Sequence, residues 1–222
     1  MVSTSARAYR FVPARVRSGV HPGGRRSITW HEAPGVIQGA ARSARAGRAV
    51  AVVGVTGPVG SGKSTLAARL GGVTISTDSY LPDYERVAYE RRDLPEHADL
   101  ARLASDLATL RDGRVARVPE WSFLTHRRES YRDVAPAELV VVEGIHALHD
   151  LARPHLDVLV FVDAPATVRW SRWEAIESDG ARGWGVEAAR EYFARVAEPT
   201  FERRRTEYLA HAHYVVINDS AA

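Results

Sequence analysis

A glycine-rich segment near residue 60 has the residue types and spacing of a phosphate-binding loop. It consists of Gly57, Pro58, Val59, Gly60, Ser61, Gly62, Lys63 and Ser64, followed by Thr65, and it matches G-x-x-x-x-G-K-[ST]. Glycines let the backbone wrap around phosphate oxygens, and the free N–H groups at a helix start attract an anion. We therefore expect residues 57–65 to bind the phosphates of ATP, with the Ser64 hydroxyl as a ligand of Mg²⁺.

The lysine of this loop is the only lysine of the chain, whose other 29 basic residues are arginines. A compact ammonium can reach between the β- and γ-phosphates, where a planar guanidinium is too bulky for the closed loop. We therefore predict that Lys63 is catalytic and stabilises the charge of the transferred γ-phosphoryl group.

Two carboxylates follow apolar runs, where strands of a parallel sheet would end. Asp78 follows the run 73–77, and a carboxylate near the phosphate loop can orient an acceptor hydroxyl and take its proton. Taken alone, Asp78 is more typical of a turn or a helix N-cap. Glu143 closes the run 139–142 and is the candidate Mg²⁺ ligand, with Asp163 in reserve. The alternative for Glu143 is a solvated strand end.

The elements that must position these residues alternate between strands and helices. Continuous apolar runs predict buried strands, and leucine spacing predicts a helix. The expected strands are residues 49–55, 73–77, 114–118, 139–142, 158–162 and 214–217. The expected helices are residues 64–70, 97–111, 166–177 and 186–209, the last with a break near Pro199. This order predicts an α/β fold, a three-layer P-loop NTPase-type parallel sheet with helices on both faces.

The composition limits the class of protein. The chain has no cysteine, 45% hydrophobic residues and a net charge of +3. Residues 1–28 hold six arginines and no acidic residue, so the remainder is slightly acidic and has no basic face for nucleic acid. No apolar run approaches the roughly 20 residues of a membrane span. We expect a cytoplasmic protein with a small-molecule substrate and no nucleic-acid or membrane partner, and a homo-oligomer stays open.

Three segments are predicted along the chain. Residues 1–28 are expected to form a disordered Arg-rich leader, with a targeting or anion-binding arm as the alternative. Residues 29–48 begin with capping-box spacing at Thr29 and Glu32, but a proline and two glycines weaken a helix there. This segment is expected to be an irregular adapter. The kinase domain then spans residues 49–222.

Several short motifs follow the loop in a characteristic order. They are Ser76, Asp78, Ser79 and Tyr80; Asp93, Pro95, Glu96 and Asp99; Pro119, Trp121, Ser122, Phe123, His126 and Arg128; Glu143, Gly144 and Ile145; Arg169 and Arg172; and Tyr192, Pro199, Phe201 and Tyr208. With these motifs, residues from about 50 to 218 resemble the uridine kinase/phosphoribulokinase family of P-loop kinases. The resemblance implies transfer of the γ-phosphate of ATP to a hydroxyl group.

The resemblance also implies roles for single residues. Asp78 would be the general base, Asp93 would hold ribose hydroxyls, and His126 would contact a pyrimidine base. Arg169 and Arg172 would line the phosphate and sugar side. The other candidate substrate contacts are Tyr80, Trp121, Phe123 and Arg128.

The departures from the family lie mainly in the acceptor pocket and the lid. Trp121 and Ser122 replace a tyrosine and an aspartate, and Arg91-Arg92 stand where uridine kinases usually have Asn-Phe. The expected lid pair Arg-Asp is Ile176-Glu177, with Arg182 nearby.

The leading hypothesis is a kinase that phosphorylates the 5′-hydroxyl of uridine or cytidine. The alternatives are a relative acting on a sugar, a sugar phosphate or a modified nucleoside, with Arg91-Arg92 binding a negative group. A nucleotide monophosphate kinase and a nucleotide-binding switch or ATPase also stay open.

Overall fold

The computed structural model describes residues 24–45 and 47–219. The strands of this part are β1 (Arg26–Thr29), β2 (Ala51–Thr56), β3 (Val73–Ser76), β4 (Ala116–Ser122), β5 (Arg127–Val134), β6 (Leu139–Glu143), β7 (Val158–Asp163) and β8 (Tyr214–Ile217). The α-helices are α1 (Ala33–Arg45), α2 (Lys63–Leu70), α3 (Leu100–Arg111), α4 (Ala166–Ser178), α5 (Val186–Tyr192) and α6 (Glu198–His211). Short 3₁₀-helices are η1 (Thr77–Tyr80), η2 (Tyr84–Arg86), η3 (Tyr89–Arg91) and η4 (Arg153–His155), and η5 (Phe193–Ala197) is a π-helix. None of these described helices is long and apolar enough to cross a membrane.

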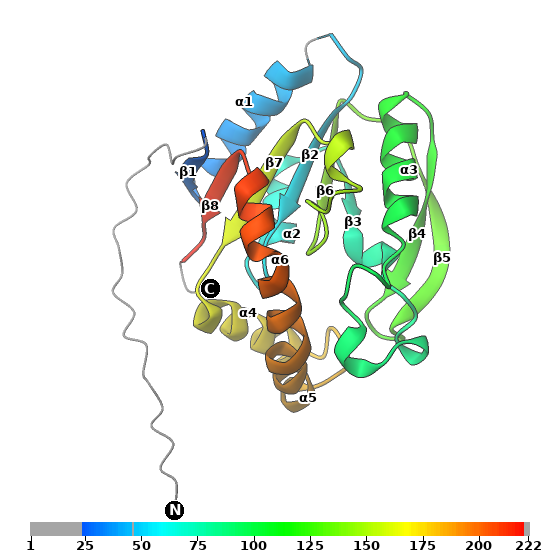
Figure 1. Ribbon diagram of the computed structural model, residues 1–222, viewed down its shortest axis with the longest axis vertical. Coiled ribbons are helices and arrows are strands. Elements are labelled where there is room, and N and C mark those ends of the chain that lie inside the picture. The colour runs from blue at the N-terminus through cyan, green and yellow to red at the C-terminus, as the bar shows by residue number, and fades with distance from the viewer. Residues whose placement is uncertain (1–23, 46, 220–222) are drawn as a thin grey trace, which may run out of the picture.

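One parallel sheet forms the centre of the fold (Figure 1). Among the described residues it has six strands in the order β1-β8-β7-β2-β6-β3. Because parallel strands need crossover connections, helices lie between them in the chain. The carboxyl ends of β2, β6 and β3 meet at one edge, so the phosphate loop, Glu143 and Asp78 are brought together there.

Helices cover both faces of the sheet, which explains the continuous apolar runs of its strands. Successive side chains of a strand point to opposite faces. In β6, Val140 and Val142 pack into the core shared with α3 and α6, whereas Val141 packs into the core shared with α1 and α2. Both faces are therefore buried, and the predicted three-layer α/β fold is confirmed.

Helix α3 follows the predicted leucine spacing. Leu100, Leu103, Leu107 and Leu110 are all buried on its inner side. The helix begins at Leu100, three residues later than expected, because the Asp99 side chain caps it by accepting a hydrogen bond from Arg102 N at 3.2 Å.

The N-terminal boundaries predicted from the sequence need correction. The predicted leader extends to residue 28, but Arg26–Thr29 forms β1, which pairs in parallel with β8. The predicted irregular adapter contains helix α1. Thr29 N donates to Glu32 Oε2 at 3.0 Å and Glu32 N donates to Thr29 Oγ1 at 3.3 Å, so the predicted capping box forms in the turn that precedes α1. Residues 1–23 of the predicted leader lie outside the described residues.

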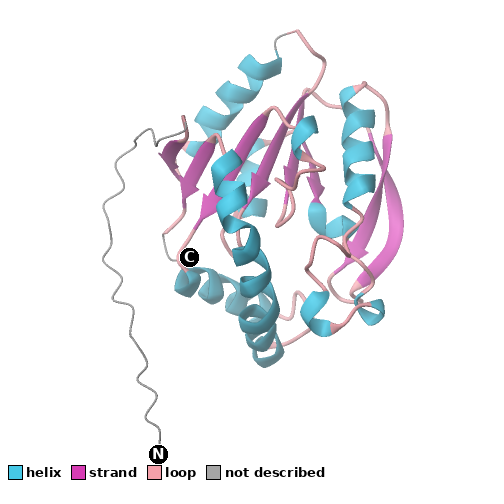
Figure 2. Ribbon diagram, in the orientation of Figure 1, coloured by secondary structure: helices cyan, strands magenta, loops and turns pink. Residues whose placement is uncertain are grey.

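Two further elements differ from the prediction. Strands β4 and β5 form an antiparallel hairpin beside α3 (Figure 2), whereas the sequence predicted only a short strand at 114–118. The polar sequence of β5 hides it, because its exposed face leaves no apolar alternation. The predicted break near Pro199 is a π-helical turn, η5, and Pro199 lies in the first turn of α6, where a missing N–H is tolerated.

Candidate active site

The predicted phosphate loop connects β2 to α2, as its motif requires. Gly60 and Gly62 have φ values of +74° and +97°, which side chains other than hydrogen rarely allow. A Cβ at Gly60 would lie 2.4 Å from the carbonyl oxygen of Arg169, and one at Gly62 would lie 2.5 Å from Asn218 Nδ2. Both the backbone conformation and the neighbouring atoms therefore require glycine in this loop.

Lys63 and Ser64 place a cation and a hydroxyl at the start of α2. The Lys63 ammonium donates to the carbonyl oxygen of Pro58 at 2.9 Å. Burial lowers the pKa of Lys63, and the carboxylates of Glu143 and Asp78 oppose this shift. Ser64 Oγ donates to Glu143 Oε2 at 3.0 Å. A hydroxyl and a carboxylate thus share one place beside the loop, and oxygen ligands of this kind suit a hard divalent cation.

The reserve metal ligand, Asp163, is engaged elsewhere. Arg205 donates to both of its carboxylate oxygens, at 2.9 and 2.8 Å. Within the described residues, no three histidine, cysteine or acidic side chains gather as a metal cluster. A Mg²⁺ ion held by Ser64 and Glu143 would therefore complete its coordination with phosphate oxygens and water, as this ion commonly does.

Asp78 lies in η1, directly after β3, and its carboxylate is electrostatically perturbed. Burial raises the pKa of Asp78 to about 7, the Glu143 carboxylate adds to the rise, and the Lys63 ammonium opposes it. Within the described part of the chain, no group donates a hydrogen bond to its carboxylate. A carboxylate with free oxygens and a pKa near neutrality can accept a proton from a hydroxyl group.

Arg169 of α4 supports the loop from behind. This buried guanidinium donates to the carbonyl oxygens of Ala164 at 2.9 Å and of Val59 at 3.3 Å, and it pairs with Glu198 of α6. The sequence predicted that Arg169 lines the phosphate and sugar side. The structure directs its side chain to the loop backbone.

Arg172 and Asn218 hold the main chain of Gly60 and Ser61 in the loop. Arg172 donates to the carbonyl oxygen of Gly60 at 3.1 Å and to Asn218 Oδ1 at 3.1 Å. Asn218 Nδ2 donates to the carbonyl oxygen of Ser61 at 2.8 Å. Because these bonds bind main-chain carbonyls, they fix the loop so that its N–H groups can face a phosphate.

A cavity beside the loop is walled mainly by aromatic rings. The space between its walls is about 590 Å³, including the part open to solvent. Val59 of the loop and Asp78 line the same cavity. Its rings are those of Tyr84, Trp121, Phe123, His126, Trp173, Trp184 and Tyr192. A flat molecule between these rings could therefore reach the carboxylate of Asp78.

Asp93 lines this cavity and is fixed by two tyrosines. The hydroxyls of Tyr84 and Tyr192 both donate to Asp93 Oδ1, at 3.0 and 2.8 Å. Burial raises the pKa of Asp93, and the two hydrogen bonds oppose this rise. Oδ2 accepts no hydrogen bond from the described residues. One oxygen thus holds the carboxylate in place, and the other is available to a ligand.

The family model that matches this chain settles its relationship to known proteins. Residues 52–217 match the Phosphoribulokinase / Uridine kinase family. The chain belongs to this family. A uridine kinase of Clostridium perfringens is 33% identical over 161 residues, which are 66% of this chain and 77% of the relative. A chloroplastic uridine/cytidine kinase of Arabidopsis thaliana is 30% identical over 167 residues, which are 68% of this chain and 34% of the relative.

A solved structure shows the same fold. The crystal structure of a candidate fructose transport system kinase from Silicibacter sp. TM1040 matches with a TM-score of 0.64 at 19% identity, covering 82% of this chain and 98% of its own. As a member of the phosphoribulokinase/uridine kinase family, the protein is a phosphotransferase.

Two residues from the family's motifs lie outside the cavity. Tyr80 is fully buried and donates from its hydroxyl to Asp106 Oδ2 at 2.9 Å. Arg128 lies on β5, where its guanidinium is 5.9 Å from the centre of the Tyr131 ring. These two predicted substrate contacts therefore lie outside the lining of this cavity. Trp121, Phe123 and His126 do line the cavity.

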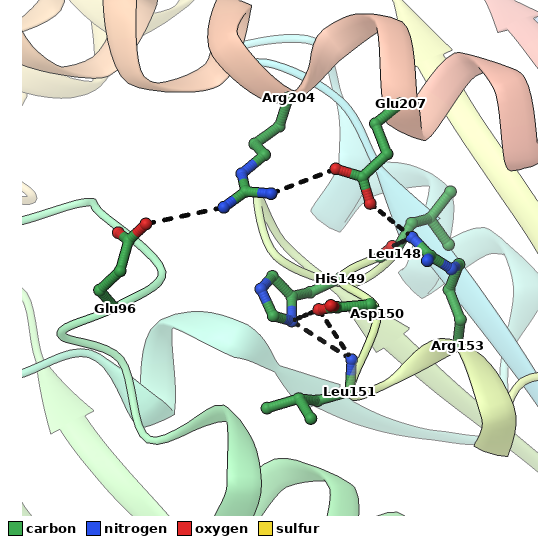
Figure 3. Close-up of polar contacts among 8 residues, drawn as sticks. All are labelled: Glu96, Leu148, His149, Asp150, Leu151, Arg153, Arg204 and Glu207. Carbon is green, nitrogen blue, oxygen red and sulfur yellow. Dashed lines mark hydrogen bonds and ion pairs between the residues drawn. The ribbon is translucent and has the colours of Figure 1, made fainter.

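A chain of ion pairs connects the family's Asp93 segment to α6 (Figure 3). Arg204 lies 3.6 Å from Glu96 and 3.2 Å from Glu207, and Glu207 lies 2.7 Å from Arg153 of η4. Because residues 94–99 form no regular element, these side chains link the segment after Asp93 to the rigid helix.

The sequence did not identify several residues that complete the site. Tyr84 and Trp184 line the cavity, and Asn218 holds the loop. Arg182, which the sequence indicated near the lid pair, lines the cavity as well. Arg182 lies over the Phe123 ring at 4.4 Å and forms no ion pair with a described residue. The signal in the sequence was the set of aromatic residues that lie between the motifs. A globular chain seldom places several aromatic residues in irregular segments unless these residues pack together.

Proposed function

We propose that the protein transfers the γ-phosphate of ATP to the 5′-hydroxyl of uridine or cytidine, with Mg²⁺ held by Ser64 and Glu143. The observation that carries this proposal is one cavity that joins Asp78, beside the phosphate loop, to Asp93 and the aromatic walls. A nucleobase would lie between the rings, the ribose hydroxyls at Asp93 and the 5′-hydroxyl at Asp78. The names of the uridine and uridine/cytidine kinase relatives support the same assignment.

Each group near the loop has a separate task in this reaction. The loop N–H groups and the Lys63 ammonium balance negative charge on the transferred phosphoryl group. Asp78 accepts the proton of the hydroxyl as the new P–O bond forms, and ADP leaves with the electrons of the broken bond. Ser64 and Glu143 would hold Mg²⁺, which would supply further neutralisation of the phosphate charge when bound.

The cavity lining favours a nucleoside over the alternative acceptors. A sugar phosphate or a nucleotide needs cationic side chains. Arg182 lines the cavity, but so do three carboxylates, those of Asp78, Asp93 and Glu177, and neither Arg91 nor Arg92 lines it. Arg92 instead lies 5.0 Å from the centre of the Tyr84 ring and 5.1 Å from that of Tyr89. An ATPase or a nucleotide-binding switch phosphorylates no acceptor, so the buried carboxylate of Asp93, held by two tyrosines, would have no role in it.

The function is tested by measuring ADP formation from ATP with uridine, cytidine, their 5′-monophosphates, sugars and sugar phosphates. We expect stimulation by uridine or cytidine and formation of the nucleoside 5′-monophosphate. Stimulation by a sugar or a sugar phosphate alone would contradict the nucleoside assignment and support the alternative acceptors.

Asp93→Asn should raise the acceptor KM by about 10-fold and change kcat less, because a charge-assisted hydrogen bond to a ribose hydroxyl becomes a neutral one. A 2′-deoxynucleoside should lose less from this substitution than the ribonucleoside. Steady-state kinetics with both acceptors measure this. Glu96→Gln, in the same segment but outside the cavity, is the control. An unchanged acceptor KM in Asp93→Asn would contradict the ribose assignment.

Asn218→Ala should raise the KM for ATP by about 5- to 10-fold, because one hydrogen bond that fixes the phosphate loop is lost. The acceptor KM should stay within about twofold, since Asn218 does not line the cavity. The matched control is Gln38→Ala, which removes a similar bond of 2.9 Å to Leu70 O at the other end of α2. Equal effects of the two variants on the KM for ATP would show a general loss of stability instead.

A further inference from the structure

Glu177, at the end of α4, lies in the cavity wall with one carboxylate oxygen unused. Its side chain is buried, with 3% of the residue exposed. Oε1 accepts a hydrogen bond from Trp173 Nε1 at 2.9 Å. Oε2 is fully buried and has no hydrogen-bond partner among the described residues. Buried polar atoms are rarely left in this state, so a ligand in the cavity is the natural partner of Oε2.

No neighbouring cation among the described residues pairs with Oε2. Glu177 forms no ion pair with any described residue. Arg182 also lines the cavity, but its guanidinium lies over the rings of Phe123 and Trp173, at 4.4 and 5.6 Å. The free oxygen therefore has no compensating partner among the described residues and remains a strong hydrogen-bond acceptor on a residue that lines the cavity.

The other polar groups of the aromatic walls cannot take this role. Burial lowers the pKa of His126, which favours a neutral ring with one acceptor nitrogen. Trp184 Nε1 donates to the His126 ring and occupies that nitrogen. His126 can therefore donate a hydrogen bond to a ligand but cannot accept one. The hydroxyls of Tyr84 and Tyr192 are bonded to Asp93.

We propose that Glu177 determines acceptor specificity by accepting a hydrogen bond from an N–H group on the nucleobase. This inference rests on the proposed nucleoside kinase function and names the part of the nucleoside that the cavity distinguishes. Cytosine offers an exocyclic amino group beside an unprotonated ring nitrogen, whereas uracil offers a ring N–H beside a carbonyl oxygen. A carboxylate at a fixed position can match only one of these two patterns well, because it accepts hydrogen bonds and does not donate them.

The decisive variant is Glu177→Gln, which keeps the size of the side chain. If the amide oxygen keeps the bond to Trp173, the amide NH₂ takes the position of Oε2. A donor then faces the base where an acceptor stood. The ratio of kcat/KM for cytidine to kcat/KM for uridine should shift by about 10-fold or more toward the nucleoside that the wild type disfavours, chiefly through KM. Circular dichroism and thermal melting verify that the variant is folded.

Glu174→Gln is the matched control, because Glu174 lies on the same helix, pairs with Arg190 at 2.9 Å and does not line the cavity. It should leave the cytidine-to-uridine ratio within about twofold. A shift in this variant as large as in Glu177→Gln would show that the ratio responds to the loss of any carboxylate on α4, and would overturn the proposal. Equal losses for both nucleosides in Glu177→Gln would overturn it too.

Substrate analogues test the same point on the wild-type protein and identify which N–H is bound. 3-Methyluridine lacks the ring N–H of uridine, and the riboside of pyrimidin-2-one lacks the amino group of cytidine. One of these should lose about 10-fold or more in kcat/KM relative to its parent, and that loss should largely disappear in Glu177→Gln. Wild-type activity with the analogues equal to that with their parents would overturn the inference and leave the kinase function standing. A wild-type protein that phosphorylates neither uridine nor cytidine would remove the proposed function itself.

Discussion

Replacing Lys63 with arginine should lower kcat by about 100-fold or more, and replacing it with alanine should do the same. The ammonium is buried at the start of α2 and held by the Pro58 carbonyl oxygen, so the loop leaves little room for a planar guanidinium. Alanine removes the positive charge that is placed in advance where the transferred phosphoryl group gains negative charge, and the bulkier guanidinium of arginine moves that charge away from this place. Single-turnover rates of nucleoside phosphorylation at saturating ATP measure the loss directly.

Arg69→Lys is a suitable control for the lysine substitution. Arg69 lies on the same helix, is exposed, and contacts the Trp30 ring at 5.0 Å instead of the loop. Its exchange should leave kcat within about twofold. Near-normal turnover of Lys63→Arg would show that the position needs only a positive charge, and the argument from the compact ammonium would be wrong.

Asp78→Asn should lower kcat by about 100-fold or more while the affinity for ATP changes little. The amide keeps the shape of the side chain but cannot take the proton of the acceptor hydroxyl. Because burial raises the pKa of Asp78 to about 7, the free carboxylate form is present above that pH and is lost as the pH falls through it. The wild-type kcat/KM should therefore rise with pH through about 7 with a slope of one proton, and the variant should lack this step.

The control for Asp78→Asn is Asp112→Asn, which removes an exposed carboxylate after α3 that pairs with Arg114. It should keep both the rate and the pH profile of the wild type. If Asp78→Asn retained the step near pH 7, another group would be responsible for it, and Asp78 would lose its assignment as the general base.

The sequence predicted the part of the site that depends on local patterns. The phosphate loop has a fixed motif, and Asp78 and Glu143 follow buried strands, so a parallel sheet brings them to one edge. Lys63 and Ser64 belong to the motif itself, and their contacts to Pro58 and Glu143 follow from its geometry.

The acceptor cavity could be predicted only in part, because its walls come from distant segments. Tyr84 and Tyr192 are 108 residues apart, yet their hydroxyls lie 3.3 Å from each other at Asp93. No periodic pattern links such residues, since Tyr84 lies in the short 3₁₀-helix η2 and Tyr192 lies at the end of α5. At Tyr80, a motif position that suggested a substrate contact instead has its hydroxyl bonded to Asp106 within the core.

The N-terminal strand was missed for a different physical reason. β1 has only four residues, two of them buried, and an edge strand needs no long apolar run. Its place beside β8 depends on pairing between residues about 190 positions apart, which local propensity does not encode.

The central claim is that the γ-phosphate of ATP passes to the 5′-hydroxyl of a pyrimidine nucleoside. The most direct measurement uses ATP labelled in its γ-phosphate, with uridine or cytidine as acceptor, and follows the label by chromatography against authentic monophosphates. We expect the label in uridine or cytidine 5′-monophosphate, in a one-to-one ratio with ADP. Label found only in inorganic phosphate, at a rate that neither nucleoside changes, would contradict the claim.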